Sequence, residues 1–202
     1  MNHPTSLSAQ YHIAHSVWRH DYDISGSHVF HVDNSAFRPG KPDLTFHAGL
    51  DTTAPVAGVC KFRHFSSDTE IGLGDPSKPG ISWERMSRES LRKVQYAFRL
   101  NCGDGRQHRF TWKKTSSLGG SHSGNLKLVD ESSGNVVAVF SSGGSFSKRT
   151  GQLDVYANYG ERFSIMVLIS GIALREKLRR ENNAAASAGA SAGSAGAAGG
   201  GC

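Results

Sequence analysis

The segment from Phe163 to Leu174 most constrains what this 202-residue chain can fold into. Its twelve residues, FSIMVLISGIAL, carry no charge and show no polar face, and Arg162 and Arg175 bracket them. As a helix the segment would span about 18 Å, whereas the hydrocarbon core of a bilayer is about 30 Å thick. A membrane-spanning helix would therefore place charges in lipid or thin the bilayer. A helix that is apolar on all sides is otherwise expected in the core of a protein.

The residues that follow this apolar segment are strongly basic. Cations at this position complement the negative C-terminal end of a helix dipole. We expect the helix to end at Asn182 and Asn183. Gly171 lowers helix propensity by about 1 kcal/mol relative to alanine, and it indicates close approach of a neighbouring side chain. The four cations are Arg175, Lys177, Arg179 and Arg180.

Most of the chain before this helix has the pattern of short strands separated by turns. Apolar and polar residues alternate with a period of two, which is typical of strands with one face toward solvent. Asp104 and Gly105, between two such runs, predict a tight hairpin. Residues 82–93 fit either a strand that ends near Met86 or a short helix. The expected strands cover residues 11–18, 28–32, 59–65, 94–100, 108–113, 125–129, 136–140 and 151–157.

These patterns together predict a mainly β fold. Strands with one apolar face need a cover for that face, and an apolar helix needs apolar surroundings. A closed antiparallel barrel of about 12 strands around the C-terminal buried helix satisfies both needs. Closure also removes the exposed sheet edges. A half-open sheet with the helix packed on one face is the alternative.

The sequence indicates one domain with two loose ends. We expect a loose N-terminus over residues 1–9, the barrel domain over residues 10–183 and a disordered tail over residues 184–202. The tail contains only Ala, Ser, Gly and one Cys, so no burial of a large apolar side chain offsets the entropy of ordering it. The three cysteines lack CxxC spacing, which is typical of a reducing compartment. We therefore expect a cytoplasmic protein, with peripheral attachment to a membrane as a further option.

Three stretches give the chain a resemblance to the tubby C-terminal-like superfamily. They are RFTWKKT (109–115), LKLVDESSGNVVAVF (126–140) and GQLDVYANYGERFSIMVLISGIALREKLRRE (151–181). That superfamily contains tubby proteins, phospholipid scramblases and LURP-one-related proteins, and the chain is most similar to uncharacterised fungal members. The resemblance spans residues 44–181 and implies a β-barrel around a C-terminal apolar helix.

The resemblance carries only a general functional implication. Tubby proteins bind phosphoinositides through basic residues on the barrel wall, so the resemblance implies recognition of anionic lipid. No local motif allows those residues to be transferred to this sequence. Lipid scrambling is not implied, because the chain has neither a cysteine cluster for acylation nor a calcium-loop pattern, and fold does not imply function.

The residue types that catalyse reactions or bind metals do not cluster in the sequence. His12 and His15 are three residues apart, as are His28 and His31, a spacing that places two side chains on opposite faces of a strand. The Cys or carboxylate partners that a metal site requires do not cluster with them. Serines lie in glycine-rich loops without a GxSxG elbow, and Cys60 lies on the apolar face of its strand. We therefore expect no enzymatic activity, no metal and no cofactor.

Basic residues on the solvent-facing sides of the expected strands form the candidate site. The net charge is +6, and the tail contributes none of it. A basic surface favours anionic partners, and six cations would form a positive wall if neighbouring strands align. Lys and Arg are also ordinary on wet strand faces, where they discourage edge pairing. The six are Lys61, Arg63, Arg99, Arg109, Lys113 and Lys127.

The predicted function is non-enzymatic recognition of anionic phospholipid headgroups at a membrane surface through this wall. Two alternatives remain open: a protein-interaction domain without a ligand, and a small-molecule or enzymatic role for a pocket at one end of the barrel. Nucleic acid is not expected, because aromatic residues that could stack on bases are not interleaved with the cations. We expect the chain to be a monomer.

Overall fold

The computed structural model describes residues 6–16, 20–35, 38, 40–63, 66–115, 126–142 and 149–195. Within these residues a series of strands precedes one long helix. The elements are β1 (Ala9–His15), β2 (Tyr22–Gly26), β3 (Phe30–Asn34), β4 (Leu44–His47), β5 (Val56–Phe62), β6 (Thr69–Leu73), β7 (Ser82–Arg88), β8 (Gln95–Asn101), β9 (Gln107–Lys114), β10 (Leu126–Asp130), β11 (Val136–Ser142), β12 (Arg149–Val155) and α1 (Glu161–Ala195).

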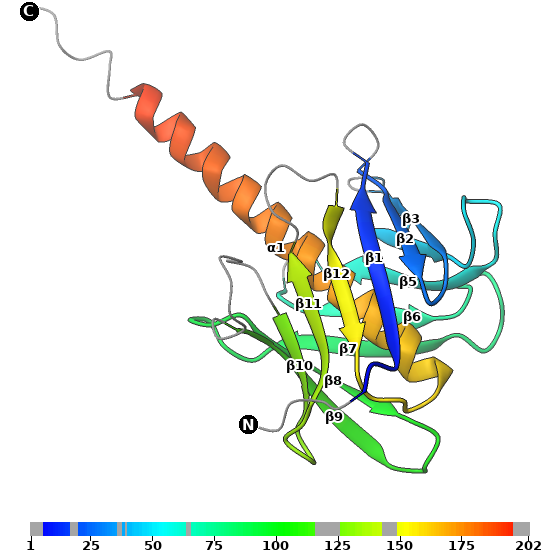
Figure 1. The fold of residues 1–202 in the computed structure, drawn as a ribbon. Coiled ribbons are helices and arrows are strands. Elements are labelled where there is room, and N and C mark those ends of the chain that lie inside the picture. Colours follow the sequence, from blue (N-terminus) through cyan, green and yellow to red (C-terminus); the bar gives the residue numbers. More distant parts are fainter. Residues whose placement is uncertain are drawn as a thin grey trace, which may run out of the picture.

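The strands form one closed antiparallel barrel (Figure 1). Each strand pairs with its neighbours in the chain, and β1 closes the barrel by pairing with β12, with Ala9 opposite Val155. Closure gives every strand two partners, which removes the edges that invite aggregation. The predicted mainly β barrel is confirmed, and the alternative of a half-open sheet is wrong.

The strands predicted from alternation are all present, with their ends shifted by a few residues. The predicted strands 11–18, 59–65 and 125–129 each include positions outside the described residues. Residues 82–93 form β7 as far as Arg88, so the strand interpretation is confirmed and the helix interpretation is wrong. The predicted hairpin joins β8 and β9, where Gly105 has a φ of 75°, a conformation that glycine adopts without strain.

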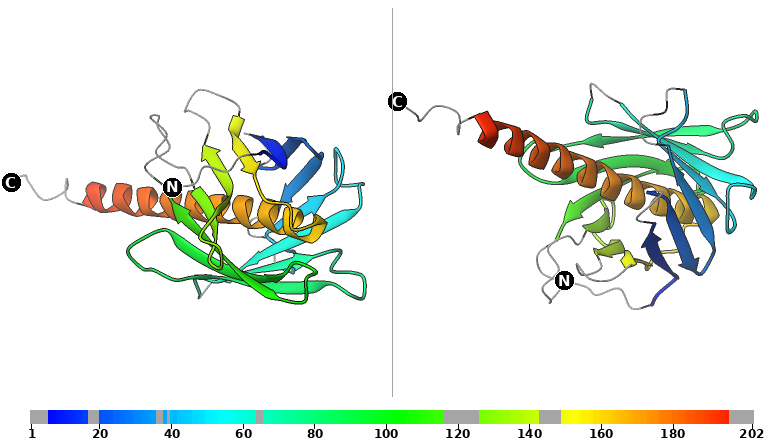
Figure 2. Two further views of the ribbon diagram at one scale, coloured as in Figure 1. Left: turned by 60° about the horizontal axis from the view of Figure 1, so that its bottom comes forward. Right: turned by 90° about the horizontal axis from the view of Figure 1, so that it is seen from above.

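Helix α1 passes through the barrel (Figure 2). Its side chains are buried without interruption from Met166 to Leu174, as the apolar segment predicted. The predicted close approach at Gly171 is also confirmed, because a Cβ atom there would lie 3.3 Å from Cζ2 of Trp112. Trp112 Nε1 donates a hydrogen bond to Ser170 Oγ at 3.0 Å, so the buried indole N–H has a partner.

The helix does not end at Asn182 and Asn183, and this prediction is wrong. It continues to Ala195, because alanine has the highest helix propensity and three alanines follow Asn183 directly. The side chains of residues 181–187 are exposed, and the end of the helix projects away from the barrel (Figure 1). A helix that packs against nothing is only marginally stable in water, so a disordered tail over residues 184–202 stays a prediction.

Candidate functional sites at the two mouths of the barrel

A barrel of this strand number is wider than one helix, because barrel diameter grows with the number of strands. Helix α1 contacts different strands at its two ends. At each end, a cavity lies on the opposite side of the helix. We call the end where α1 begins, at Glu161, the helix-start mouth. We call the end where α1 leaves the barrel, near Arg180, the helix-exit mouth.

At the helix-exit mouth, α1 is tied to β2 and β3 by a buried carboxylate. Glu176 is fully buried. It accepts hydrogen bonds from Tyr22 Oη at 2.5 Å and from Asn34 Nδ2 at 3.1 Å. Arg179 donates two further bonds, at 2.7 and 2.8 Å, and Arg180 Nε donates one at 2.8 Å. The buried negative charge is thus fully partnered, the condition under which a buried ion is tolerated.

The same network fixes the charge of Glu176 and reaches the start of β4. Burial alone would raise the pKa of Glu176, but hydrogen bonds from Arg179, Tyr22, Arg180 and Asn34 outweigh burial and lower that pKa to about 2. Arg180 Nη1 also donates to Asp43 Oδ1 at 2.8 Å. Residues at the beginning of the barrel therefore hold the C-terminal part of the buried helix through charge-assisted bonds, which are stronger than neutral ones.

The opposite side of the helix-exit mouth is a pocket of about 300 Å³ between α1 and the ends of β9 and β10. Arg175 lies against Phe140, with 5.8 Å between the guanidinium carbon and the ring centroid, and burial lowers the pKa of Arg175. Hydrogen bonds to Glu176 raise the pKa of Arg179. Among the described residues, the lining of the pocket includes three cations and no carboxylate: Val94, Lys114, Leu126, Arg175, Leu178, Arg179 and Asn182.

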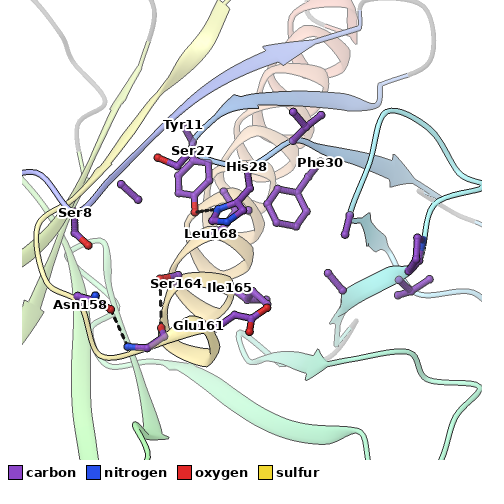
Figure 3. A pocket seen from close by; sticks show the side chains of 17 residues that line it. Ser8, Tyr11, Ser27, His28, Phe30, Asn158, Glu161, Ser164, Ile165 and Leu168 are labelled. Atoms are coloured by element: carbon purple, nitrogen blue, oxygen red, sulfur yellow. Dashed lines mark hydrogen bonds between the residues drawn. The ribbon is translucent and has the colours of Figure 1, made fainter.

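At the helix-start mouth, α1 leans on the aromatic side chains of β9 and of the segment before the helix. The Phe163 ring lies 5.1 Å from the Phe110 ring and 5.0 Å from the Tyr159 ring, measured between centroids. Tyr159 Oη donates to Asp130 Oδ2 at 3.1 Å. The other side of this mouth, toward β1, β3 and β5, holds a cavity of about 890 Å³ (Figure 3).

The six cations predicted as one positive wall form two separate patches. One patch lies on β8, β9 and β10, where Arg99 is opposite Arg109 and Lys113 is opposite Lys127. The other lies at the end of β5, and β6 and β7 separate it from the first. It contains Lys61 and Arg63. The structure therefore brings four of the six together and leaves two apart, and their role in binding lipid stays a prediction.

Several of these cations form ion pairs with carboxylates, and one lies over an aromatic ring. Lys61 Nζ lies 4.8 Å from the centroid of the Trp83 ring. Among the described residues, Arg99 and Lys127 have no ion-pair partner. The positive potential of each patch is therefore weaker than the six charges alone suggest. The ion pairs are Arg63 with Glu70, Arg109 with Glu89 and Lys113 with Glu131.

The sequence did not indicate the pocket at the helix-exit mouth. Lys114 is two residues from Trp112 on β9, so its side chain shares the inner face of the strand. A cation at an inward-facing position near the end of a strand indicates the mouth of a barrel. The alternation pattern of β9 already contained this signal. Arg175 and Arg179 were explained as partners of the helix dipole, and no local pattern distinguishes that role from lining a pocket.

The described residues offer neither a metal site, nor a reactive cysteine in the core, nor a membrane-spanning helix. No group of three or more His, Cys, Asp or Glu side chains in this part of the chain is arranged to hold a metal ion. Cys60 lies in the core as predicted, and burial raises the pKa of its thiol well above the usual value. Over the same residues, the helix lacks a stretch of the length and hydropathy that crossing a bilayer requires.

Comparison of the chain with known protein families, with curated proteins and with solved structures finds no match in any of the three. The barrel with its C-terminal helix is compatible with the tubby C-terminal-like superfamily, and membership stays a prediction.

Proposed function

We propose that this domain binds anionic phospholipid headgroups at a membrane surface, and that the pocket at the helix-exit mouth receives the headgroup. The observation that carries the proposal is the convergence of Lys114, Arg175 and Arg179 on one pocket whose described lining has no carboxylate. Guanidinium groups present several N–H donors in a planar fork that matches a phosphate, and a lysine adds a mobile positive charge.

The size of the pocket and its surroundings support this ligand class. About 300 Å³ is at the small end of ligand pockets, which suits a headgroup rather than a whole lipid. Lys113 and Lys127 are the chain neighbours of Lys114 and Leu126, which line the pocket, and they face each other across β9 and β10. Positive charge thus continues from the pocket over the rim onto the outer wall, where each cation adds about 1 kcal/mol of attraction to an anionic membrane.

The environment of Arg175 also favours an anionic ligand. Burial lowers the pKa of Arg175, because removal from water destabilises the charged form of the guanidinium. An anion bound beside the guanidinium would add to its stabilisation. Arg179 already donates two hydrogen bonds to Glu176, so Lys114 is expected to supply a larger share of the attraction than Arg179.

Combining Lys114→Glu with Lys127→Glu should weaken binding to anionic vesicles at least tenfold, because two cations at the rim become anions. Sedimentation with phosphatidylcholine vesicles that contain phosphatidylserine or a phosphoinositide measures the effect. Binding of the parent should also fall between about 0.05 and 0.5 M salt, since salt screens surface charges.

The matched control is Lys61→Glu combined with Arg63→Glu, which makes the same change of charge in the patch on β5. It should weaken binding much less, because these residues lie away from the pocket. An equal loss in both double variants would assign the binding to overall charge and not to the pocket. A parent that ignores anionic vesicles at about 0.05 M salt would refute the proposed function itself.

A further inference from the structure

The cavity at the helix-start mouth has the size of a site for a small molecule. Its volume of about 890 Å³ lies near the upper end of the range of about 300–1,000 Å³ for ligand pockets. Figure 3 shows Tyr11 and Phe30 of the barrel wall and Ile165 and Leu168 of the helix lining this cavity. They come from β1, β3 and α1, and Val56 of β5 adds a further apolar side chain. The framework of the site is therefore the barrel and the buried helix.

Polar atoms along this cavity bond to each other. Tyr11 Oη and His28 Nδ1 are 3.4 Å apart. Ser164 Oγ donates to the Gly160 carbonyl at 3.3 Å, and the Gly160 N–H donates to Asn158 Oδ1 at 3.1 Å (Figure 3). Because these groups have partners within the protein, the cavity wall does not need a polar ligand to satisfy them. An apolar ligand would leave no hydrogen bond broken.

The charged side chains of the lining disfavour anionic ligands. The described residues around the cavity include no Lys or Arg, and Glu161 contributes a carboxylate. An anionic head would lie near that carboxylate without a cation to offset the repulsion. Hydroxyl groups of Ser8 and Ser27 are also part of the lining, and they can donate to or accept from an uncharged head.

Three exposed apolar residues lie within, or next to, segments that line this cavity. Leu7, 50% exposed, precedes Ser8, and Val29, 42% exposed, lines the cavity. Leu50, 83% exposed, lies in the loop between Ala48 and Pro55, both of which line the cavity. Exposed apolar side chains in or beside the segments that line a pocket favour an apolar partner there.

We infer that this cavity binds the hydrocarbon chain of an uncharged amphiphile, with the chain beside Leu168 and the polar head at the serine hydroxyls of the mouth. The ligand class is a single-chain lipid with a hydroxyl, ester or amide head, such as a monoacylglycerol. The site shares no residue with the pocket at the helix-exit mouth, so the inference goes beyond the proposed function and stands or falls separately.

The experiment titrates the full chain with 1-monolauroylglycerol below its micelle concentration, and with dodecanoate as the charged probe of equal chain length. Calorimetry should show saturable binding of one monolauroylglycerol per chain and much weaker binding of dodecanoate. Ile165→Trp should fill the cavity and weaken monolauroylglycerol binding at least tenfold. Leu91→Ser removes an exposed leucine outside this mouth and should leave the binding unchanged.

Glu161→Gln supplies a result that a folding defect cannot imitate. It removes the carboxylate of the lining, so dodecanoate should bind several-fold more tightly than it binds the parent. Circular dichroism establishes that each variant is folded. Absence of saturable monolauroylglycerol binding to the parent overturns the inference, as does an undiminished affinity in folded Ile165→Trp. Dimerisation that blocks the probe would also overturn it, because a second copy of the chain would then be the occupant of the mouth.

Discussion

Replacing Ile169 with aspartate should leave no cooperatively folded protein. Ile169 is fully buried in the part of α1 that lies inside the barrel, and its Cδ1 atom lies 2.4 Å from the position that a Cβ atom on Gly58 of β5 would take. The helix thus touches the barrel wall here without room for water. A carboxylate at this position would be buried without a partner. Burial of an unpaired charge is among the single changes that lower the free energy of unfolding most.

Urea unfolding followed by circular dichroism measures the effect. The control is Ile169→Val, which removes one methylene group at the same place and should cost about 0.5–1.5 kcal/mol. Together the pair separates the cost of charge from the cost of lost packing. An aspartate variant with the same unfolding midpoint as the parent would mean that this face of the helix is wet.

Replacing Glu176 with glutamine should cost about 3 kcal/mol of unfolding free energy at pH 7. The pKa of this carboxyl is about 2 in the folded chain and 4.5 for an unperturbed glutamate, and a difference of this size corresponds to about 3 kcal/mol. Since the folded pKa is the lower one, the stabilisation is present above pH 4.5 and is lost as the pH falls toward 2. At pH 3 the difference between parent and variant should be less than half of its value at pH 7.

Urea unfolding of both proteins at the two pH values tests this. Glu181→Gln is the matched control, because Glu181 is an exposed residue of the same helix, and such changes usually cost no more than about 0.5 kcal/mol. A cost that does not depend on pH would show that packing of the side chain, and not its charge, holds the helix at this mouth.

The fold could be predicted from the sequence because each of its main determinants is local. Alternation indicated the longer strands, and the uncharged run from Phe163 to Leu174 indicated what they enclose. The strands β2, β4 and β6, of 5, 4 and 5 residues, were not indicated, although β3 and β10 are as short; pairing with their neighbours in the barrel holds them in place. The true end of the helix was missed because Asn182 and Asn183 interrupt neither its hydrogen bonds nor its geometry.

The candidate sites depend on contacts between distant parts of the chain, so they could be predicted only in part from the sequence. Alternation placed Arg109 outside the barrel, but it could not show that Glu89, 20 residues earlier, would pair with it. Glu176 looks like an ordinary acid in a basic helix end. Its burial follows from its bonds to Tyr22 and Asn34, which are more than 140 residues away in the chain.

Native-state hydrogen exchange tests most directly the central claim that the barrel closes around the apolar helix. Amides of residues 166–174 should exchange only when the whole domain unfolds, with the same opening free energy as the strands around them. Amides of residues 184–195 should exchange far faster, because the exposed side chains of residues 184–187 give the helix no packing that would suppress fraying. Exchange of residues 166–174 through local opening, as fast as that of residues 184–195, would contradict the account, since the segment could not then be enclosed by the barrel.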